Sequence, residues 1–475
     1  MKRHSIKQRL SLPGHSLPSL WLPSFLLSAM VLLGCSTVAN AQVLPGASNT
    51  VIPPIDTLTR RLPAEPKVRL PRRLDNNKVE TSALVKSLPP LESTLNDALL
   101  NSVSPLQQVV RIVGSKQQTL LQEELTPEGD LAIAREWVVS ASKADVTWLA
   151  QSPFAVTKKR YLALLDRWLV TIQVPKIYNT LAKLKAMLPA HMQDNIERNH
   201  VFLTQTHQAQ TSENTLITSA SDEVTPHCKR PSRIGMLDSA IETSHPLLAS
   251  LEIDEQVFID PSLPRSLSHG TAVAGVLQYH LAAQSQLINA AVFYARNQVS
   301  QGASVYDLVS GLDWLAKQQV SVINMSLTGP HNEVLARAIS ALAKKGVTMV
   351  AAVGNAGPAA LPLYPAAYLE VIGVSAVDTN GDIYRWANQG QQVDVSALGV
   401  GVNTARINAN IGPESGTSIA SPVIAGWLAQ WRSCQPKIHS PVTDIPPVLK
   451  RQLQDKGEPG WDPVFGEGVW LPQNP

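Results

Sequence analysis

The chain has 475 residues, which is longer than most single domains and allows about three. Hydrophobic residues make up 44% of the chain and charged residues only 16%, which is the composition of a globular protein with an ample core. The formal net charge of +3 is small for this length, so the composition gives no support to nucleic-acid binding.

The first 41 residues have the pattern of an export signal. Basic residues precede an apolar run at 25–33, and Ala39-Asn40-Ala41 is a small-x-small cleavage site. The run is too short to remain in a bilayer as a spanning helix. We therefore expect cleavage after Ala41 and a secreted or periplasmic protein. The alternative is lipoprotein processing and a membrane anchor at Cys35, because Leu32-Leu33-Gly34-Cys35 resembles a lipobox with an atypical leucine before the glycine.

Residues 42–105 are rich in proline and carry scattered basic residues, which predicts an extended linker without a core of its own. Ordered structure is expected to begin near Val109.

Residues 106–204 predict a small α+β domain. Four β-rich stretches are separated by helix patterns, and Ser142 with Asp145 three residues later can cap the first helix. The expected strands are 136–141, 154–165, 167–174 and a last one that ends near Leu203, and the expected helices are 142–152 and 177–188. The apolar face of the second helix consists of Ile177, Leu181, Leu184 and Leu188. The order β-α-β-β-α-β is the ferredoxin-like, split βαβ arrangement.

The C-terminal half of the chain, residues 233–475, alternates strand and helix patterns. Strands are expected at 286–293, 320–325, 347–352 and 371–374, and Ser304 with Asp307 can cap an intervening helix. This alternation predicts an α/β domain with a parallel sheet and helices on both faces. The stretch before it, residues 205–232, is polar and rich in Ser and Thr, which predicts a loop.

Three motifs in this half carry groups suited to nucleophilic catalysis. Asp238 ends an apolar stretch, at the strand end where open α/β sheets place their sites. His269 precedes a run of small residues suited to a tightly packed helix. Ser418 lies in Gly416-Thr417-Ser418-Ile419-Ala420-Ser421-Pro422, at the start of an apolar helix whose free N–H groups would stabilise an oxyanion. Taken singly, each residue is explained by an ordinary strand end, helix start or cap.

Together the three motifs resemble those of the subtilisin-like serine proteases, in the order that subtilisin uses. A serine hydroxyl needs an adjacent base to become a nucleophile, and a carboxylate holds the histidine in the correct tautomer. The resemblance implies that Ser418 is the nucleophile, His269 the general base and then acid, and Asp238 the orienting carboxylate. It also implies a subtilisin-like doubly wound parallel sheet from about Arg233 to Val469.

A fourth motif ends in a glycine-rich turn with Asn355 at its tip, for which the resemblance implies an oxyanion donor. The alternative is an ordinary turn residue. Ser326, Leu327 and Thr328 resemble the strand that pairs with the substrate backbone, and Gly354 joins them as a substrate-binding residue. The alternative for these three is the end of a sheet strand.

Two residues depart from the family pattern. Ala240 stands where glycine is usual, which would strain the backbone if the position requires a positive φ. Thr328 also replaces a usual glycine, which predicts a narrower mouth of the specificity pocket.

The resemblance also gives the N-terminal domain a role. In this family, a small α+β domain between signal peptide and catalytic domain is an inhibitory propeptide whose last strand leads a tail into the active cleft. Residues 199–203 resemble that junction. This implies that 106–204 is an intramolecular inhibitor and chaperone and that 205–232 is a processing loop. The alternative is an unrelated accessory domain.

We therefore expect an exported serine endopeptidase that is made as a preproprotein and acts on polypeptides. The alternative is a catalytically silent relative that binds peptides in the same cleft and keeps its N-terminal domain. An α/β-hydrolase is disfavoured, because the chain has no G-x-S-x-G and the triad order differs. No cofactor or metal ligand is predicted. Calcium sites are common in the family, but no acidic loop here is specific enough to name one.

The chain has three cysteines, and cleavage after Ala41 removes Cys35. Cys228 and Cys434 then remain as a pair in an exported protein, where disulfides form and persist. We expect a Cys228–Cys434 bridge, and the alternative is two unpaired thiols.

Overall fold

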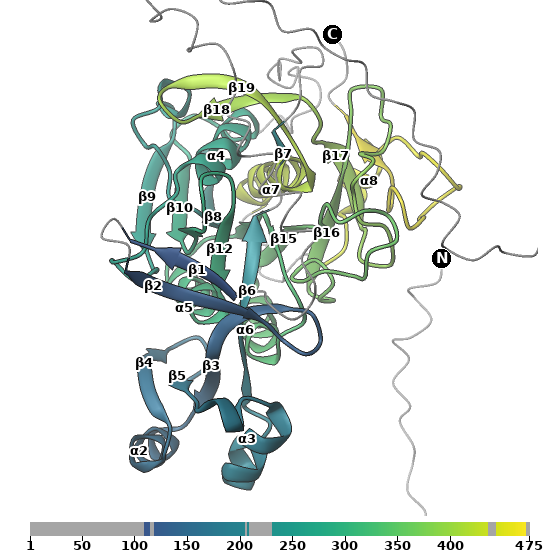
Figure 1. Cartoon of the computed structure of the whole chain (residues 1–475). Helices are drawn as coiled ribbons and strands as arrows, with labels where there is room; N and C mark the ends of the chain where they lie inside the picture. The colour runs from purple at the N-terminus through teal and green to yellow at the C-terminus, as the bar shows by residue number, and fades with distance from the viewer. Residues whose placement is uncertain (1–108, 115–117, 205–206, 209–229, 436–442, 472–475) are drawn as a thin grey trace, which may run out of the picture. The chain divides into compact units, whose positions relative to one another are not determined.

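The computed structural model describes residues 109–114, 118–204, 207–208, 230–435 and 443–471 (Figure 1). The predicted leader, the proline-rich linker, Cys35, Cys228 and most of the predicted processing loop lie outside the described residues. We call 109–204 the N-terminal region and 230–471 the catalytic region. None of the helices in these ranges has the length and apolar character needed to cross a bilayer.

The catalytic region is built on an eight-stranded sheet in the order β20-β17-β16-β15-β13-β8-β10-β9, and every pairing along it is parallel. Figure 1 shows β9 and β10 at one end of this sheet and β17 towards the other. Its strands are β8 (Arg233–Asp238), β9 (Glu252–Val257), β10 (Gln286–Ala291), β13 (Val322–Met325), β15 (Thr348–Ala352), β16 (Val371–Val377), β17 (Val395–Leu398) and β20 (Val469–Trp470). The predicted parallel α/β sheet is therefore confirmed.

Helices cover both faces of this sheet. Successive residues of a strand point in opposite directions, so neighbouring side chains pack against different helices. On β8, Met236 belongs to a buried cluster with α4 and α7, whereas Leu237 belongs to a second cluster with α5 and α6. The two-sided burial explains the continuous apolar runs of these strands. The helices are α4 (Ser268–His280), α5 (Val305–Leu315), α6 (Glu333–Lys344), α7 (Thr417–Ser433) and α8 (Pro447–Lys450), with a 3₁₀ turn η5 (Pro246–Leu248).

The N-terminal region has the predicted element order β-α-β-β-α-β. Its strands pair antiparallel in the order β6-β3-β5-β4. The elements are β3 (Leu131–Ala141), α2 (Lys143–Gln151), β4 (Ala155–Leu162), β5 (Arg167–Gln173), η3 (Lys176–Tyr178), α3 (Leu181–Met187), η4 (Ala190–Met192) and β6 (Ile196–Thr204). The predicted cap of the first helix is present, with Ser142 and Asp145 forming a reciprocal capping box.

The second predicted helix was placed too early. Ile177 lies in the 3₁₀ turn η3 and is 64% exposed, so it does not share a buried face with Leu184. The turn ends at Asn179, and Thr180 is extended, so α3 starts only at Leu181. The Asn179 side chain instead accepts a hydrogen bond from Trp137 Nε1 at 3.1 Å, a tertiary contact that favours the break.

Two strands precede the predicted fold. β1 (Val109–Val113) and β2 (Thr119–Leu125) form an antiparallel hairpin, and β2 also pairs with β3. β6 in turn pairs with two short strands of the catalytic region, β12 (Gln301–Ser304) and β14 (Leu327–Thr328). One sheet, β1-β2-β3-β6-β12-β11, therefore contains strands of both regions, with β11 (Tyr294–Ala295) at its edge.

A third sheet has three short antiparallel strands. β18 (Val402–Arg406) pairs with β19 (Asn410–Ser415), which ends just before α7. β19 also pairs with β7 (His207–Gln208), opposite Ser415 and Glu414.

Candidate active site

Asp238 is the last residue of β8, at the carboxyl end of a strand that lies between β10 and β13. Its side chain is fully buried. The Oδ1 atom accepts a hydrogen bond from the Ser239 N–H at 2.7 Å and lies 2.6 Å from His269 Nδ1. A carboxylate at Nδ1 favours the tautomer with its proton there, which leaves Nε2 able to accept a proton.

The start of α4 packs closely against the chain that follows β8. A Cβ at Gly270 would collide with the Ser239 carbonyl oxygen, so only glycine permits this approach. The Gly270 N–H also donates to Ser239 Oγ at 2.8 Å. These contacts hold the adjacent His269 against Asp238. Sequence reasoning missed Ser239 and Gly270, although both stand beside a motif residue.

His269 is buried, and its Nε2 makes no hydrogen bond. The structure therefore joins Asp238 to His269 but contains no hydrogen bond from Ser418 to His269. Catalytic hydrogen bonds of this kind are often made only when substrate is bound. A buried imidazole nitrogen without a partner is unusual in a folded protein and is consistent with a base that acts on a hydroxyl.

Ser418 is the second residue of α7, and α7 packs against α4. The helix cap is Gly416, whose φ of 148° lies in the region that favours glycine. Pro422 has no N–H, which leaves the Ser418 carbonyl without its helical donor. Ser326 Oγ donates to that carbonyl instead, at 2.8 Å.

A hydrogen-bond chain extends this contact. Ser421 Oγ donates to Asn324 Oδ1 at 2.7 Å, and Asn324 Nδ2 donates to Ser326 Oγ at 2.9 Å. The first turn of α7 is thereby tied to the end of β13. Asn324 and Ser421 were not predicted as site residues, although Ser421 belongs to the serine motif and Asn324 to the strand expected just before Ser326.

Asn355 follows β15 and contacts the start of α7. Its Oδ1 accepts from the Thr417 N–H at 3.1 Å and from Thr417 Oγ1 at 3.0 Å. These two bonds to Thr417 hold the oxygen of the Asn355 side-chain amide and thereby fix the orientation of the amide plane. Gly354, with a φ of 109°, donates its N–H to Thr417 Oγ1 at 3.1 Å. Thr417 thus joins two predicted site residues, and its place in the serine motif is the signal that could have revealed it.

The three residues predicted to pair with substrate are buried: Ser326, Leu327 and Thr328. Leu327 and Thr328 form β14, which pairs with Thr204 and Leu203 of the N-terminal region. Ala240 does not have a positive φ, so this departure from the family pattern brings no backbone strain.

The described residues contain no group of three or more His, Cys, Asp or Glu side chains placed to hold a metal ion. Cys434 caps the C-terminus of α7. Its predicted partner, Cys228, lies outside the described residues, so the disulfide stays a prediction.

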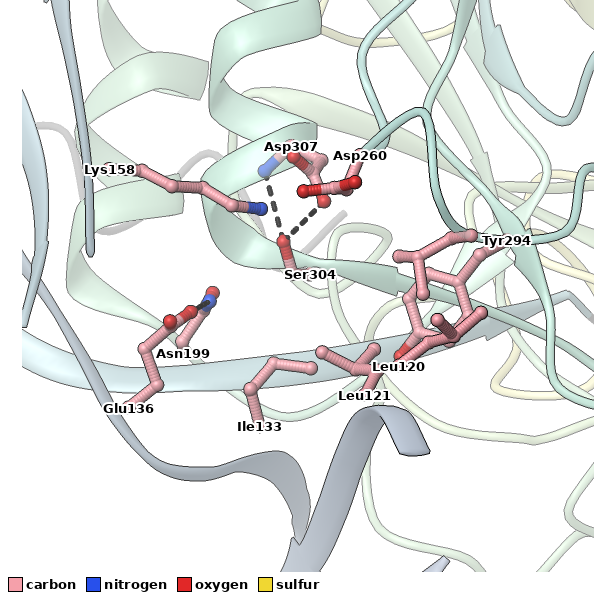
Figure 2. Close-up of a pocket in the computed structure, with 11 residues that line it drawn as sticks. Leu120, Leu121, Ile133, Glu136, Lys158, Asn199, Asp260, Tyr294, Ser304 and Asp307 are labelled. Carbon is pink, nitrogen blue, oxygen red and sulfur yellow. Dashed lines mark hydrogen bonds between the residues drawn. The ribbon is translucent and has the colours of Figure 1, made fainter. Parts of the chain in front are cut away.

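A cavity of about 150 Å³ lies away from these residues, between the N-terminal and catalytic regions. Figure 2 shows Asp307 and Ser304 on its wall, with Lys158 of β4 extending towards them. Ser304 Oγ donates to Asp307 Oδ2 at 2.7 Å, whereas Asp307 Oδ1 is buried and without a hydrogen bond. Burial raises the pKa of Asp307 to about 6, although Lys158 and the Ser304 hydroxyl act to lower it.

Comparison with known proteins agrees with this geometry. The family model described as the subtilase family matches residues 230–468, which is half of the chain. The major intracellular serine protease of Bacillus subtilis (strain 168) is 30% identical over 221 residues, which cover 42% of this chain and 68% of that protein. Subtilisin DY of Bacillus licheniformis is 32% identical over 210 residues, which cover 42% of this chain and 75% of that protein.

Other relatives are longer. The minor extracellular protease Epr of Bacillus subtilis (strain 168) is 28% identical over 242 residues, which are 50% of this chain but only 37% of Epr. Among solved structures, fervidolysin from Fervidobacterium pennivorans, described as a keratinolytic enzyme related to subtilisin, aligns with a TM-score of 0.56 and 17% identity. That alignment covers 78% of this chain and 63% of fervidolysin, and it supports the fold. With the family model matching half of its length, the chain belongs to the subtilase family.

Proposed function

We propose that the protein is an exported serine endopeptidase that hydrolyses peptide bonds through Asp238, His269 and Ser418. The observation that carries the proposal is the buried Asp238–His269 pair, whose Oδ1···Nδ1 distance is 2.6 Å and whose Nε2 is left without a partner. Ser418, at the start of the helix packed against α4, supplies the matching nucleophile.

In the proposed reaction, His269 Nε2 takes the proton of the Ser418 hydroxyl as the oxygen attacks the substrate carbonyl carbon. Asp238 steadies the imidazolium that forms. The oxyanion accepts hydrogen bonds from the Ser418 N–H and the Asn355 amide, both at the positive end of α7. His269 then gives its proton to the leaving amine, and water releases the acyl group from Ser418 by the reverse route.

We further propose that the N-terminal region is an inhibitor of this site. β6 is an extended strand that pairs antiparallel with both β12 and β14, as a polypeptide substrate would. Phe202 on this strand is fully buried, and a Cβ at Gly329 would lie 2.6 Å from its ring. A strand held on these edges excludes other polypeptides from them.

The same pairings suggest where the chain is cut. Thr204 pairs with Leu327, and His207 pairs with Ser415, three residues before Ser418. We therefore expect self-cleavage between Thr204 and His207, within the range predicted from the sequence. Export through the leader and the Cys228–Cys434 bridge complete the proposal. N-terminal sequencing and non-reducing peptide mapping of the exported protein test these two points.

Labelling with a fluorophosphonate probe tests the catalytic proposal. We expect the processed wild-type protein to be labelled at Ser418 and the Ser418→Ala chain to remain unlabelled. An unlabelled wild-type protein that nevertheless binds peptides would favour the catalytically silent alternative.

A further inference from the structure

The hairpin β1–β2 lies outside the β-α-β-β-α-β unit but contacts the catalytic region. Ile112 of β1 is buried in a cluster with Ile259, Leu263 and Tyr294. Leu120 and Leu121 of β2 pack against the same cluster. The hairpin therefore buries apolar surface against the catalytic region, independently of the β6 pairings near the active site.

An ion pair with a fully buried carboxylate lies beside this apolar cluster. Glu123 of β2 is fully buried, and its carboxylate accepts hydrogen bonds from three donors of the catalytic region. Arg296 Nε lies 3.0 and 2.9 Å from the two oxygens, Arg296 Nη2 lies 2.7 Å from Oε2, and Tyr294 Oη lies 2.8 Å from Oε1. Within the described ranges, Glu123–Arg296 is the ion pair that joins the two regions.

The surroundings make this pair sensitive to the loss of either partner. The Arg296 side chain is 13% exposed, and its remaining Nη1 donates to Ser300 Oγ at 3.0 Å. Burial and the adjacent Glu123 carboxylate raise the pKa of Tyr294 well above its ordinary value, so its hydroxyl stays a donor. A buried carboxylate is tolerated when both of its oxygens accept hydrogen bonds, whereas a buried charge without a partner destabilises the protein.

We propose that the hairpin β1–β2 is a clamp that keeps the N-terminal region bound after the connecting chain is cut, and that Glu123, held by Arg296 and Tyr294, is its closing contact. The cut is part of the proposed function, but the clamp contact itself does not depend on it.

The neighbouring carboxylate provides a matched control. Glu124 points to the N-terminal region, where it accepts from Arg198 Nη1 at 2.9 Å, Asn179 Nδ2 at 2.8 Å and the Arg135 N–H at 3.0 Å. Glu123→Gln and Glu124→Gln are the same chemical change on adjacent residues of one strand. Only the first leaves Arg296, whose side chain is 13% exposed, without its counter-charge.

The test uses the full Ser418→Ala chain, with the recognition sequence of an unrelated protease inserted within 212–220. The folded protein is nicked there, and dissociation of the two fragments is followed by size-exclusion chromatography. We expect Glu123→Gln to dissociate at least about 30-fold faster than the parent, as for a buried charge pair that loses one partner. Glu124→Gln should stay within about threefold of the parent, because its partners all lie in the N-terminal region.

The clamp proposal would be overturned if the Glu123→Gln fragments dissociated at the same rate as those of the parent. It would also be overturned if Glu124→Gln accelerated dissociation as much as Glu123→Gln does. Arg296→Gln gives a second route to the same contact. If the pair is the closing contact, Glu123→Gln with Arg296→Gln should dissociate no faster than the faster single variant, whereas multiplied effects would contradict the coupling. Because nicking is external, these outcomes do not depend on the peptidase activity, which the fluorophosphonate probe tests separately.

Discussion

The two regions of the molecule bury their strands in different ways. β16 of the catalytic region is buried along its whole length, whereas exposed and partly buried residues alternate along β4 of the N-terminal region. The catalytic sheet is covered on both faces, and one of its two buried clusters consists of catalytic-region residues alone. In the N-terminal region, one buried cluster, which includes Leu184, is formed by residues of that region alone. Phe202 belongs instead to a cluster formed mainly by the catalytic region.

This difference suggests a division of roles. The catalytic region carries the proposed catalytic residues on a sheet that is buried on both faces, while the N-terminal region gains part of its stability from the surface that it covers. We therefore expect changes in the first region to alter turnover and changes in the second to alter its release. Substitutions in each region test this division.

Ser418→Ala should remove peptide hydrolysis, with a loss of about 10⁶-fold in turnover, the size found for the nucleophile of subtilisin. The change removes one hydroxyl from a buried helix start, so the fold should remain intact. Cleavage of a mixed peptide library, read by mass spectrometry, measures the loss, and circular dichroism checks the fold. Ser433→Ala, on the same helix, is the control. Appreciable turnover by a clean Ser418→Ala preparation would refute the assignment.

Phe202→Ala should weaken the association of the two regions by about 3–5 kcal/mol, the usual cost of truncating a buried phenylalanine. Its ring packs beside Gly329 of the catalytic region. Fragment dissociation in the nicked chain measures the effect. Leu184→Ala should instead lower the stability of the N-terminal region itself. If both variants change only the unfolding of the N-terminal region, the clusters that contain Phe202 and Leu184 do not differ in role as proposed.

Asn355→Ala should lower turnover by about 10²–10³-fold, as found for loss of one oxyanion donor in subtilisin. The loss should appear in kcat with KM little changed, because the bond strengthens only as the oxyanion forms. Steady-state kinetics on one peptide substrate decides the point. A raised KM with unchanged kcat would make Asn355 a binding residue.

Asp307 should make stability depend on pH. Its pKa in the folded chain is raised from 3.8 to about 6, so its contribution is fully present below pH 3.8 and is lost as the pH rises through about 6. Lys158 and Arg160 of β4 and Glu136 of β3 are the charged groups that act on it. Between pH 3.8 and about pH 6, the free energy of unfolding that Asp307 contributes falls by about 3 kcal/mol.

Urea unfolding of the Ser418→Ala chain at pH 4 to 7 measures this effect. Asp307→Asn should be relatively more stable at pH 7 than at pH 4, when each is compared with the parent at the same pH. A difference between the two chains that does not change with pH would show that Asp307 has no raised pKa.

Local pattern was sufficient for the main features of the catalytic region. The apolar run into Asp238 predicted a buried parallel strand, because a strand covered on both faces has no polar alternation. The caps at Ser142 and Ser304 were also predictable, because a cap depends on residues only a few positions apart. The motifs named Asp238, His269, Ser418 and Asn355 by resemblance. Their hydrogen-bond partners Ser239 and Thr417 were missed, since neither residue type is unusual in sequence.

What the sequence by itself determined is therefore the set of elements and the motifs that stand at their ends. Only the tertiary structure decided how distant segments meet. The Glu123–Arg296 contact spans 173 positions, and nothing near either residue signals the other. Likewise, Pro422 in the sequence indicates only an ordinary first helix turn. The folded structure shows that Ser326 donates to the Ser418 carbonyl, for which Pro422 has no N–H. Local patterns follow from backbone geometry, whereas these contacts depend on which buried polar groups the folded chain brings within reach of each other.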